Sequence, residues 1–140
     1  RCRLELLAGV KNSIIINDSY NSSPVALEAA LEVLSKFKKN RKVAVLGSMR
    51  ELGVNTESAH RAVGRQAVKV AEVLFLVGEE MVFAKEEAEK SKKKMEGLFW
   101  FADSNGAAKE VERILRPGDV VLIKGSRGIK MELVVEEIKV

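Results

Sequence analysis

The sequence has very little cysteine, histidine and proline: one cysteine, Cys2, one histidine, His60, and two prolines in 140 residues. A single cysteine excludes a disulfide within the chain and is typical of a reducing compartment, so we expect a cytoplasmic protein. One cysteine and one histidine are also too few for the usual zinc cage. We therefore expect no metal ligands in this chain.

Long hydrophobic segments are missing as well. The longest apolar runs, such as residues 73–77, are far shorter than the roughly 20 residues that a membrane-spanning helix needs. No secretory signal is visible at the N-terminus. The sequence therefore predicts no membrane segment.

Aromatic residues make up only 5% of the chain, and the net charge of +4 is mild. Basic side chains gather at residues 36–42 and 90–94, near the ends of two expected helices. Such runs can bind nucleic acid, or they can be solvated helix ends whose cations complement the helix dipole. With so few aromatic rings to stack on bases, we favour solvated helix ends and expect no nucleic-acid partner.

Hydrophobic residues (46%) and charged residues (31%) are present in the proportions of one folded domain over residues 1–140. Short apolar runs alternate with segments of helical period, which predicts a doubly wound α/β fold with a mostly parallel sheet and helices on both faces. A short turn joins the first two strands, so we expect an antiparallel strand at the N-terminal edge. The expected strands are 1–7, 13–17, 42–46, 73–77, 98–101 and 120–123; the expected helices are 24–38, 56–70, 80–94, 105–115 and 131–138.

Residues 18–24 (Asp-Ser-Tyr-Asn-Ser-Ser-Pro) link a β-branched strand to a helix. Ser22 and Ser23 are suitable N-cap residues, and Pro24 suits the first helical position, where an N–H would have no partner. In open α/β sheets, ligands bind beyond the carboxyl ends of the strands, and helix N-termini attract anions. The corner predicts either an anion site or simply a well-capped turn.

Two further strand-to-helix corners are unusually polar, at residues 47–53 and 124–128. In a doubly wound sheet all three corners lie along one edge, so they can line a common site. The last corner, Lys-Gly-Ser-Arg-Gly, combines two cations with two glycines that let the backbone approach a ligand. It lacks the spacing of a Walker phosphate loop. His60 follows the second corner, where a lone histidine is more often structural than catalytic.

Together these corners resemble the Mur ligase family of ATP-dependent amide-forming enzymes. Residues 18–24 resemble that family's Asp-Asp/Ser-Tyr-Asn-Ala-Asn-Pro, and residues 45–53 resemble its Val-Leu-Gly-Asp-Met-x-Glu-Leu-Gly. Ser58, His60, Arg61 and Gly64 roughly match a further pattern, and residues 124–127 match Lys-Gly-Ser-Arg. The order is most similar to the branch that adds D-Ala-D-Ala to UDP-MurNAc-tripeptide in peptidoglycan synthesis.

The resemblance implies a Rossmann-like C-terminal domain, cut from a longer three-domain enzyme. It implies that ATP phosphorylates the carboxylate of UDP-MurNAc-tripeptide and that the amine of D-Ala-D-Ala attacks the acyl phosphate. Mg²⁺ would be held mainly by the central domain, which is not in this sequence. The partners would be these substrates and the enzyme's own central and N-terminal domains, and we expect this domain to be inactive alone.

The resemblance also implies roles for individual residues. Arg1, Asp18, Tyr20, Asn21 and Ser22 would contact the nucleotide, with Asp18 accepting hydrogen bonds from ribose hydroxyls. Ser48, His60 and Ser126 would contact the substrate. Lys124 and Arg127 would be catalytic and, like Ser126, would face the dipeptide or the phosphate being transferred, where cations stabilise developing charge.

Two residues depart from the family pattern. Ser23 replaces an asparagine, and Ser48 replaces an aspartate whose charge helps to hold the incoming amine. Two alternatives remain open: a free-standing nucleotide-binding or interaction module of the same fold, and the C-terminal domain of a sister ligase of the glutamate-adding or folylpolyglutamate type.

Overall fold

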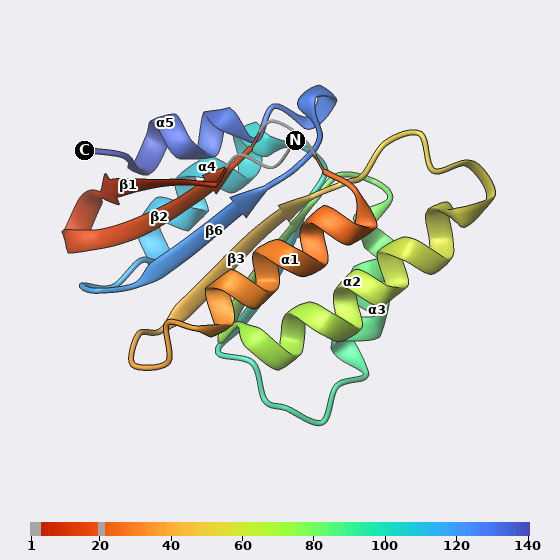
Figure 1. Cartoon of the computed structure of the whole chain (residues 1–140), viewed down its shortest axis with the longest axis horizontal. Helices are drawn as coiled ribbons and strands as arrows, with labels where there is room; N and C mark the ends of the chain where they lie inside the picture. Colours follow the sequence, from red (N-terminus) through yellow and green to blue (C-terminus); the bar gives the residue numbers. More distant parts are fainter. Residues whose placement is uncertain (1–3, 20–21) are drawn as a thin grey trace.

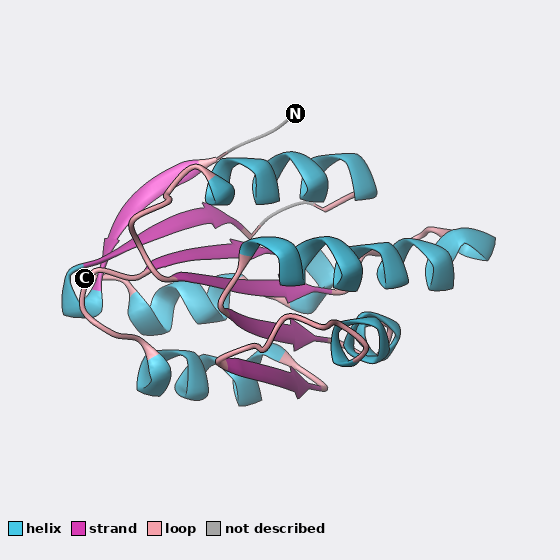
Figure 2. Ribbon diagram, turned by 90° about the horizontal axis from the view of Figure 1, so that it is seen from below, coloured by secondary structure: helices cyan, strands magenta, loops and turns pink. Residues whose placement is uncertain are grey.

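The computed structural model describes residues 4–19 and 22–140, and within them six strands form one sheet in the order β1-β2-β6-β3-β4-β5 (Figures 1 and 2). β1 pairs with β2 antiparallel, and every other neighbouring pair is parallel. The expected fold class, including the antiparallel edge strand, is confirmed. The strands are β1 Glu5–Gly9, β2 Ser13–Asp18, β3 Lys42–Gly47, β4 Val73–Val77, β5 Gly97–Phe101 and β6 Val120–Lys124.

Helices cover both faces of the sheet (Figure 2). The first three pack on one face and the last two on the other, each contributing buried apolar residues to the cluster on its side. The helices are α1 Pro24–Ser35, α2 Thr56–Val70, α3 Met81–Glu89, α4 Ser104–Ile114 and α5 Glu132–Ile138, with 3₁₀ turns at Val10–Asn12, Gly53–Asn55 and Arg127–Ile129. None of the helices in the described part of the chain is long and apolar enough to cross a membrane.

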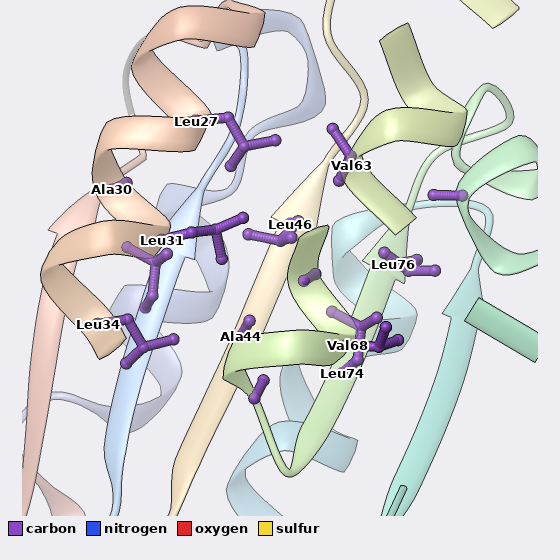
Figure 3. Close-up of a cluster of buried hydrophobic side chains, with 14 of the residues drawn as sticks. Leu27, Ala30, Leu31, Leu34, Ala44, Leu46, Val63, Val68, Leu74 and Leu76 are labelled. Atoms are coloured by element: carbon purple, nitrogen blue, oxygen red, sulfur yellow. The ribbon is translucent and has the colours of Figure 1, made fainter. Parts of the chain in front are cut away.

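The central strands are buried on both sides, which explains their unbroken apolar runs. Ala44 and Leu46 of β3 face α1 and α2, as Figure 3 shows, while Val43 and Val45 contribute to the opposite cluster. β5 follows the same alternation at the sheet edge, where Trp100 lies on the face opposite to its phenylalanine neighbours. The core is therefore two apolar layers separated by the sheet.

Two helices end earlier than expected, α1 at Ser35 and α3 at Glu89. In α3 the last buried residue is Ala88, and the lysines beyond it have no apolar face to place on the sheet. The chain then continues to β5, beside β4, and the Glu96 amide donates to the Glu72 carbonyl just before the two strands begin. The helical pattern stops where its buried stripe stops.

Arg41, at the amino end of β3, is a partly buried connector rather than part of a solvated run. Its guanidinium donates to the Asp119 carboxylate at 2.8 Å and to the Ile114 carbonyl at 2.8 Å. A third contact reaches Glu96 at 3.0 Å. Arg41 therefore ties together segments that precede β3, β5 and β6.

Candidate functional site at the carboxyl edge

The three polar corners meet at the carboxyl edge, the edge of the sheet where β2, β6, β3, β4 and β5 end (Figure 1). β6 lies between β2 and β3 in the sheet, so Lys124 is level with Asp18 on one side and with Leu46 on the other. Parallel neighbours end at the same edge, which brings residues from distant parts of the sequence together. The expectation that the corners share one edge is confirmed.

Asp18 and Lys124 form a buried ion pair at the middle of this edge. The Lys124 Nζ lies 2.6 Å from the Asp18 Oδ2, and the two side chains are 2% and 3% exposed. Burial of either charge alone is costly, and a partner at hydrogen-bond distance offsets much of that cost. The pair therefore binds the end of β2 to the end of β6, so each residue expected to face a ligand also contacts the other.

The α1 N-terminus opens beside this pair. Ser23 is its N-cap, with the side-chain oxygen accepting from the Ala26 amide at 3.1 Å, and Pro24 takes the first helical position. The Ser22 Oγ is buried and has no hydrogen-bond partner among the described residues. Tyr20 and Asn21, and likewise Arg1, lie outside the described residues.

His60 holds the β3 corner, the segment of residues 47–53 that follows β3, through its backbone. Its Nε2 accepts from the Met49 amide at 3.0 Å, and its Nδ1 lies 2.6 Å from the Thr56 carbonyl. Because Nε2 accepts, the proton belongs on Nδ1, which donates to that carbonyl. The side chain is fully buried with both ring nitrogens bound to backbone. In this arrangement His60 holds the loop that carries Ser48 and Arg50.

Ser126 connects the β3 corner with the β6 corner, residues 124–128. Its buried Oγ accepts from the Arg50 amide at 3.3 Å. Arg127 follows it and is exposed. A Cβ atom on Gly125 would lie 2.3 Å from the Met131 Cγ, so this glycine makes room for a core side chain.

In the part of the chain that the structure describes, no group of three or more His, Cys, Asp or Glu residues is arranged to hold a metal ion. The side chains that the three corners place at the carboxyl edge are hydroxyls, carboxylates and basic groups. Such groups recognise phosphates, hydroxyls and the charged ends of small molecules.

Comparison with known protein families shows the family to which the chain belongs. Residues 2–127 match the family described as Mur ligase, glutamate ligase domain. The chain belongs to the Mur ligase family. The three motif corners of this Mur ligase domain are the segments that the fold gathers at the carboxyl edge.

Similar proteins include UDP-N-acetylmuramoyl-tripeptide–D-alanyl-D-alanine ligases. The Bacillus subtilis protein is 32% identical over 139 residues, which cover 97% of this chain and 30% of the relative. The Treponema pallidum protein is 33% identical over 116 residues, covering 82% of this chain and 25% of the relative. The chain thus spans less than a third of the length of these relatives.

Solved structures of Mur ligases have the same fold as this chain. MurF ligase from Thermotoga maritima in complex with ADP superimposes with a TM-score of 0.80 at 30% identity, covering 96% of this chain and 30% of that one. MurF from Acinetobacter baumannii superimposes with a TM-score of 0.82 at 27% identity, and the match covers 98% of this chain and 29% of that one. A domain from a Haemophilus ducreyi ligase, 20% identical, shares the fold with a TM-score of 0.64, and 99% of that chain is covered.

The structure of this Mur ligase domain adds two residues that motif analysis did not select. Arg50 extends from the β3 corner, and its guanidinium lies against Gly128, 3.5 Å from the position a Cβ would take there. Glu80 lies just beyond β4, two residues after Gly78, and a Cβ built on Gly78 would lie 2.2 Å from the Ser48 Oγ. No sequence signal points to Glu80, because the approach of Ser48 to the segment after β4 depends on the pairing of β3 with β4.

Proposed function

We propose that this chain is the C-terminal domain of an ATP-dependent ligase that adds D-Ala-D-Ala to UDP-MurNAc-tripeptide. The observation that carries the proposal is the assembly of three family motifs at one edge, linked by the Asp18–Lys124 and Arg50–Ser126 contacts. Relatives that carry this activity in their names match nearly the whole chain. The reaction would run through an acyl phosphate on the acceptor carboxylate, as the family resemblance implies.

The residues beside α1 fit a nucleotide. An unpaired buried hydroxyl on Ser22, a carboxylate on Asp18 and the N-terminus of a 12-residue helix lie close in sequence at the carboxyl edge. Together they offer groups suited to ribose hydroxyls and to negative charge. ATP would supply the phosphoryl group, and Mg²⁺ would be bound mainly by the central domain. Arg1, Tyr20 and Asn21 complete the proposed nucleotide contacts.

The β6 corner would serve the reacting groups. Arg127 is exposed and presents a planar fork that suits two oxygens of a carboxylate or phosphate. Lys124 adds positive charge behind it and holds Asp18 in place at 2.6 Å. Ser48 and Ser126 would lie next to the incoming dipeptide, with His60 contributing by holding the intervening loop.

The partner domains in this proposal are the central and N-terminal domains of the same enzyme. They would supply the phosphate loop, which this sequence lacks, and the site for the UDP end of the acceptor. A free-standing module of the same fold, or a sister ligase domain, would use the same edge. Those two alternatives differ in the parent protein and in the amino donor.

The test uses the full-length protein that contains this chain. It is incubated with ATP, UDP-MurNAc-tripeptide and either D-Ala-D-Ala, D-Glu or no donor, and phosphate release is measured beside the product mass. We expect phosphate release only when D-Ala-D-Ala is the donor. The product should then be heavier than UDP-MurNAc-tripeptide by the mass of one dipeptide minus one water. Reaction with D-Glu instead of D-Ala-D-Ala would favour a sister ligase. A parent protein without any phosphate loop would favour the free-standing module.

A further inference from the structure

Two basic runs that are far apart in the sequence lie at the amino edge of the sheet, opposite the carboxyl edge (Figure 1). Residues 36–42 lead into β3, and residues 90–94 lie between α3 and β5, which runs in the same direction as β3. The two runs hold nine basic residues and no acidic one, whereas the rest of the chain holds 15 basic and 20 acidic residues. The positive charge is therefore concentrated in these two runs, which we call the basic edge.

The segment before β4 joins the two runs. The Lys42 amide donates to the Glu72 Oε1 at 2.7 Å, and the Lys93 Nζ donates to the Ala71 carbonyl at 2.9 Å. The Glu72 carboxylate also lies 3.5 Å from the Lys42 Nζ and 4.0 Å from the Lys93 Nζ. Glu72 thus contacts one lysine from each run, and the fold holds the two runs side by side.

Most of the other cations of the basic edge face solvent. Arg41 pairs with Asp119, and Lys90 pairs with Glu87. Five lysines are exposed and make no ion pair with any described residue: Lys36, Lys38, Lys39, Lys92 and Lys94. Because no carboxylate of the fold offsets these charges, they attract a negatively charged partner.

The composition of the basic edge favours one class of partner. Protein interfaces are depleted in lysine, and nucleic-acid sites commonly use arginine forks and aromatic rings that stack on bases. The unpaired cations here are lysines, and Phe37 packs against the core. Lysines are flexible point charges, which suit a broad array of negative headgroups. Clusters of about four to eight basic residues are typical of surfaces that bind anionic lipid.

The basic edge offers charge without apolar anchors. None of the large apolar side chains that are exposed in the described part of the chain belongs to either run. Binding through this edge is therefore electrostatic, without insertion into the acyl region, and weakens as salt is added. β3 has six residues, so the amino and carboxyl edges are roughly 20 Å apart. A partner at the basic edge leaves the carboxyl edge accessible.

We propose that the basic edge binds reversibly to an anionic lipid bilayer. Lysines of both runs contact the negative headgroups together, and the carboxyl edge faces away from the bilayer. The inference goes beyond the proposed ligase function and does not depend on the reaction or on the amino donor.

The experiment measures cosedimentation of the full-length protein with lipid vesicles. One set of vesicles contains phosphatidylglycerol and phosphatidylcholine in equal parts, and the other contains phosphatidylcholine alone. We expect binding to the anionic vesicles only. This binding should be lost in about 0.5 M salt, where the screening length falls to roughly 4 Å.

Matched variants locate the surface. The test variant combines three substitutions in the basic edge: Lys39→Gln, Lys92→Gln and Lys94→Gln. The control removes the same charge elsewhere, on α3, on α4 and after α5: Lys85→Gln, Lys109→Gln and Lys139→Gln. We expect the test variant to bind anionic vesicles about a hundredfold more weakly, from roughly fivefold per lysine, and the control to stay within about threefold of the wild type.

The unpaired lysines make few contacts, so the melting temperature of the test variant should match that of the wild type. If the test variant fails to fold, the same comparison with Lys36→Gln and Lys38→Gln decides, with an expected loss of about twentyfold or more. Unchanged vesicle binding by this second variant overturns the proposal.

The outcomes separate this inference from other readings and from the proposed function. Equal binding to both kinds of vesicle, or equal loss in the test and control variants, overturns it. Binding to an oligonucleotide duplex without binding to anionic vesicles also overturns it and assigns the basic edge to nucleic acid. Ligase activity without vesicles should be the same for the wild type and both triple variants. A wild type that never uses D-Ala-D-Ala overturns the proposed function alone.

Discussion

At the residue scale, the buried pair of Asp18 and Lys124 joins the ends of β2 and β6 at the carboxyl edge. Each side chain is almost fully removed from water, and each depends on the other for compensation at 2.6 Å. Breaking such a pair leaves an uncompensated buried charge, which costs more than the pair contributes when intact. Lys124 therefore stabilises the fold by pairing with Asp18, in addition to any proposed contact with a reacting group.

Lys124→Met should lower the free energy of unfolding of the 140-residue chain by about 3–5 kcal/mol, and Asp18→Asn should also be destabilising. The double variant should lose much less than the sum of the single losses, because neither charge is then stranded. Urea denaturation of all four proteins measures the coupling. Additive losses would show that the two side chains do not depend on each other.

Arg127 differs from Lys124 because it is exposed at the start of a 3₁₀ turn. Arg127→Lys keeps the charge and removes the planar fork, so turnover of the full-length enzyme should fall about tenfold or more. Thermal stability should barely change. A sharp drop in melting temperature with normal specific activity of the folded fraction would instead identify Arg127 as structural.

The carboxyl of Glu80 should make stability depend on pH. Burial acts to raise its pKa, but hydrogen bonds from its own amide and from Ser48, with the charge of Arg50, hold the pKa below its usual value. A folded-state pKa below the unfolded one means that ionised Glu80 stabilises the fold at neutral pH. This contribution is lost as pH falls below about 4.5 and through the folded-state pKa.

Glu80→Gln should therefore be less stable than the wild type at pH 7, and the difference should shrink towards pH 3. Urea denaturation of the chain across this range measures it, with Glu79→Gln as the matched control. A difference that stays constant with pH would mean that the charge of Glu80 contributes nothing to the fold.

At the scale of the elements, the contact of α2 with α3 depends on one small residue. A Cβ on Gly64 would lie 2.2 Å from the Ala84 carbonyl oxygen, so the two helix backbones approach closely there. Ion pairs flank the contact, with Arg61 bonding Glu86 and Glu87 of α3 at 2.9 and 3.0 Å. The packing of α2 on α3 is therefore stabilised by the close backbone contact at Gly64 and by the ion pairs of Arg61 beside it.

Gly64→Ala should destabilise the chain by about 1–3 kcal/mol, because the helices must separate to admit the methyl group. This outcome opposes intrinsic helix propensity, which favours alanine over glycine by about 1 kcal/mol. Thermal denaturation followed by circular dichroism measures the effect, with Lys69→Ala on the exposed side of α2 as control. An increase in melting temperature for Gly64→Ala would contradict the close approach.

At the scale of the whole molecule, two complete apolar layers enclose the sheet. The described residues of the proposed site lie at one edge of the sheet, and the sequence has no Walker phosphate loop. Folding and activity should therefore separate: the domain contains its own core but only part of the proposed active site.

The isolated 140-residue chain should fold cooperatively and show no ligase activity. ATP should bind it weakly, because the proposed ribose contacts remain while phosphate and magnesium contacts are missing. Denaturation curves, phosphate release and titration calorimetry test the three statements. Low-micromolar ATP affinity, equivalent to about −8 kcal/mol, would reveal a phosphate site within this chain.

Much of the fold was predictable from the sequence because its determinants are local. Apolar runs of β-branched residues indicated strands, and a 3.6-residue period with Ser23 and Pro24 at its start indicated α1. The bounds of α2 and β4 match the expected ranges. The end of α3 did not, because it is set by where the helix leaves the sheet.

The sequence by itself determined the alternation of strands and helices, the polar corners and the family, because each depends on residues close together in the chain. Only the tertiary structure decided which corners touch. β6 inserts between β2 and β3, which places Lys124 against Asp18 across 106 positions of sequence. The pairing of β3 with β4 likewise brings the Ser48 amide to the Val77 carbonyl, at 2.9 Å. Such contacts follow from strand order, which no local pattern specifies.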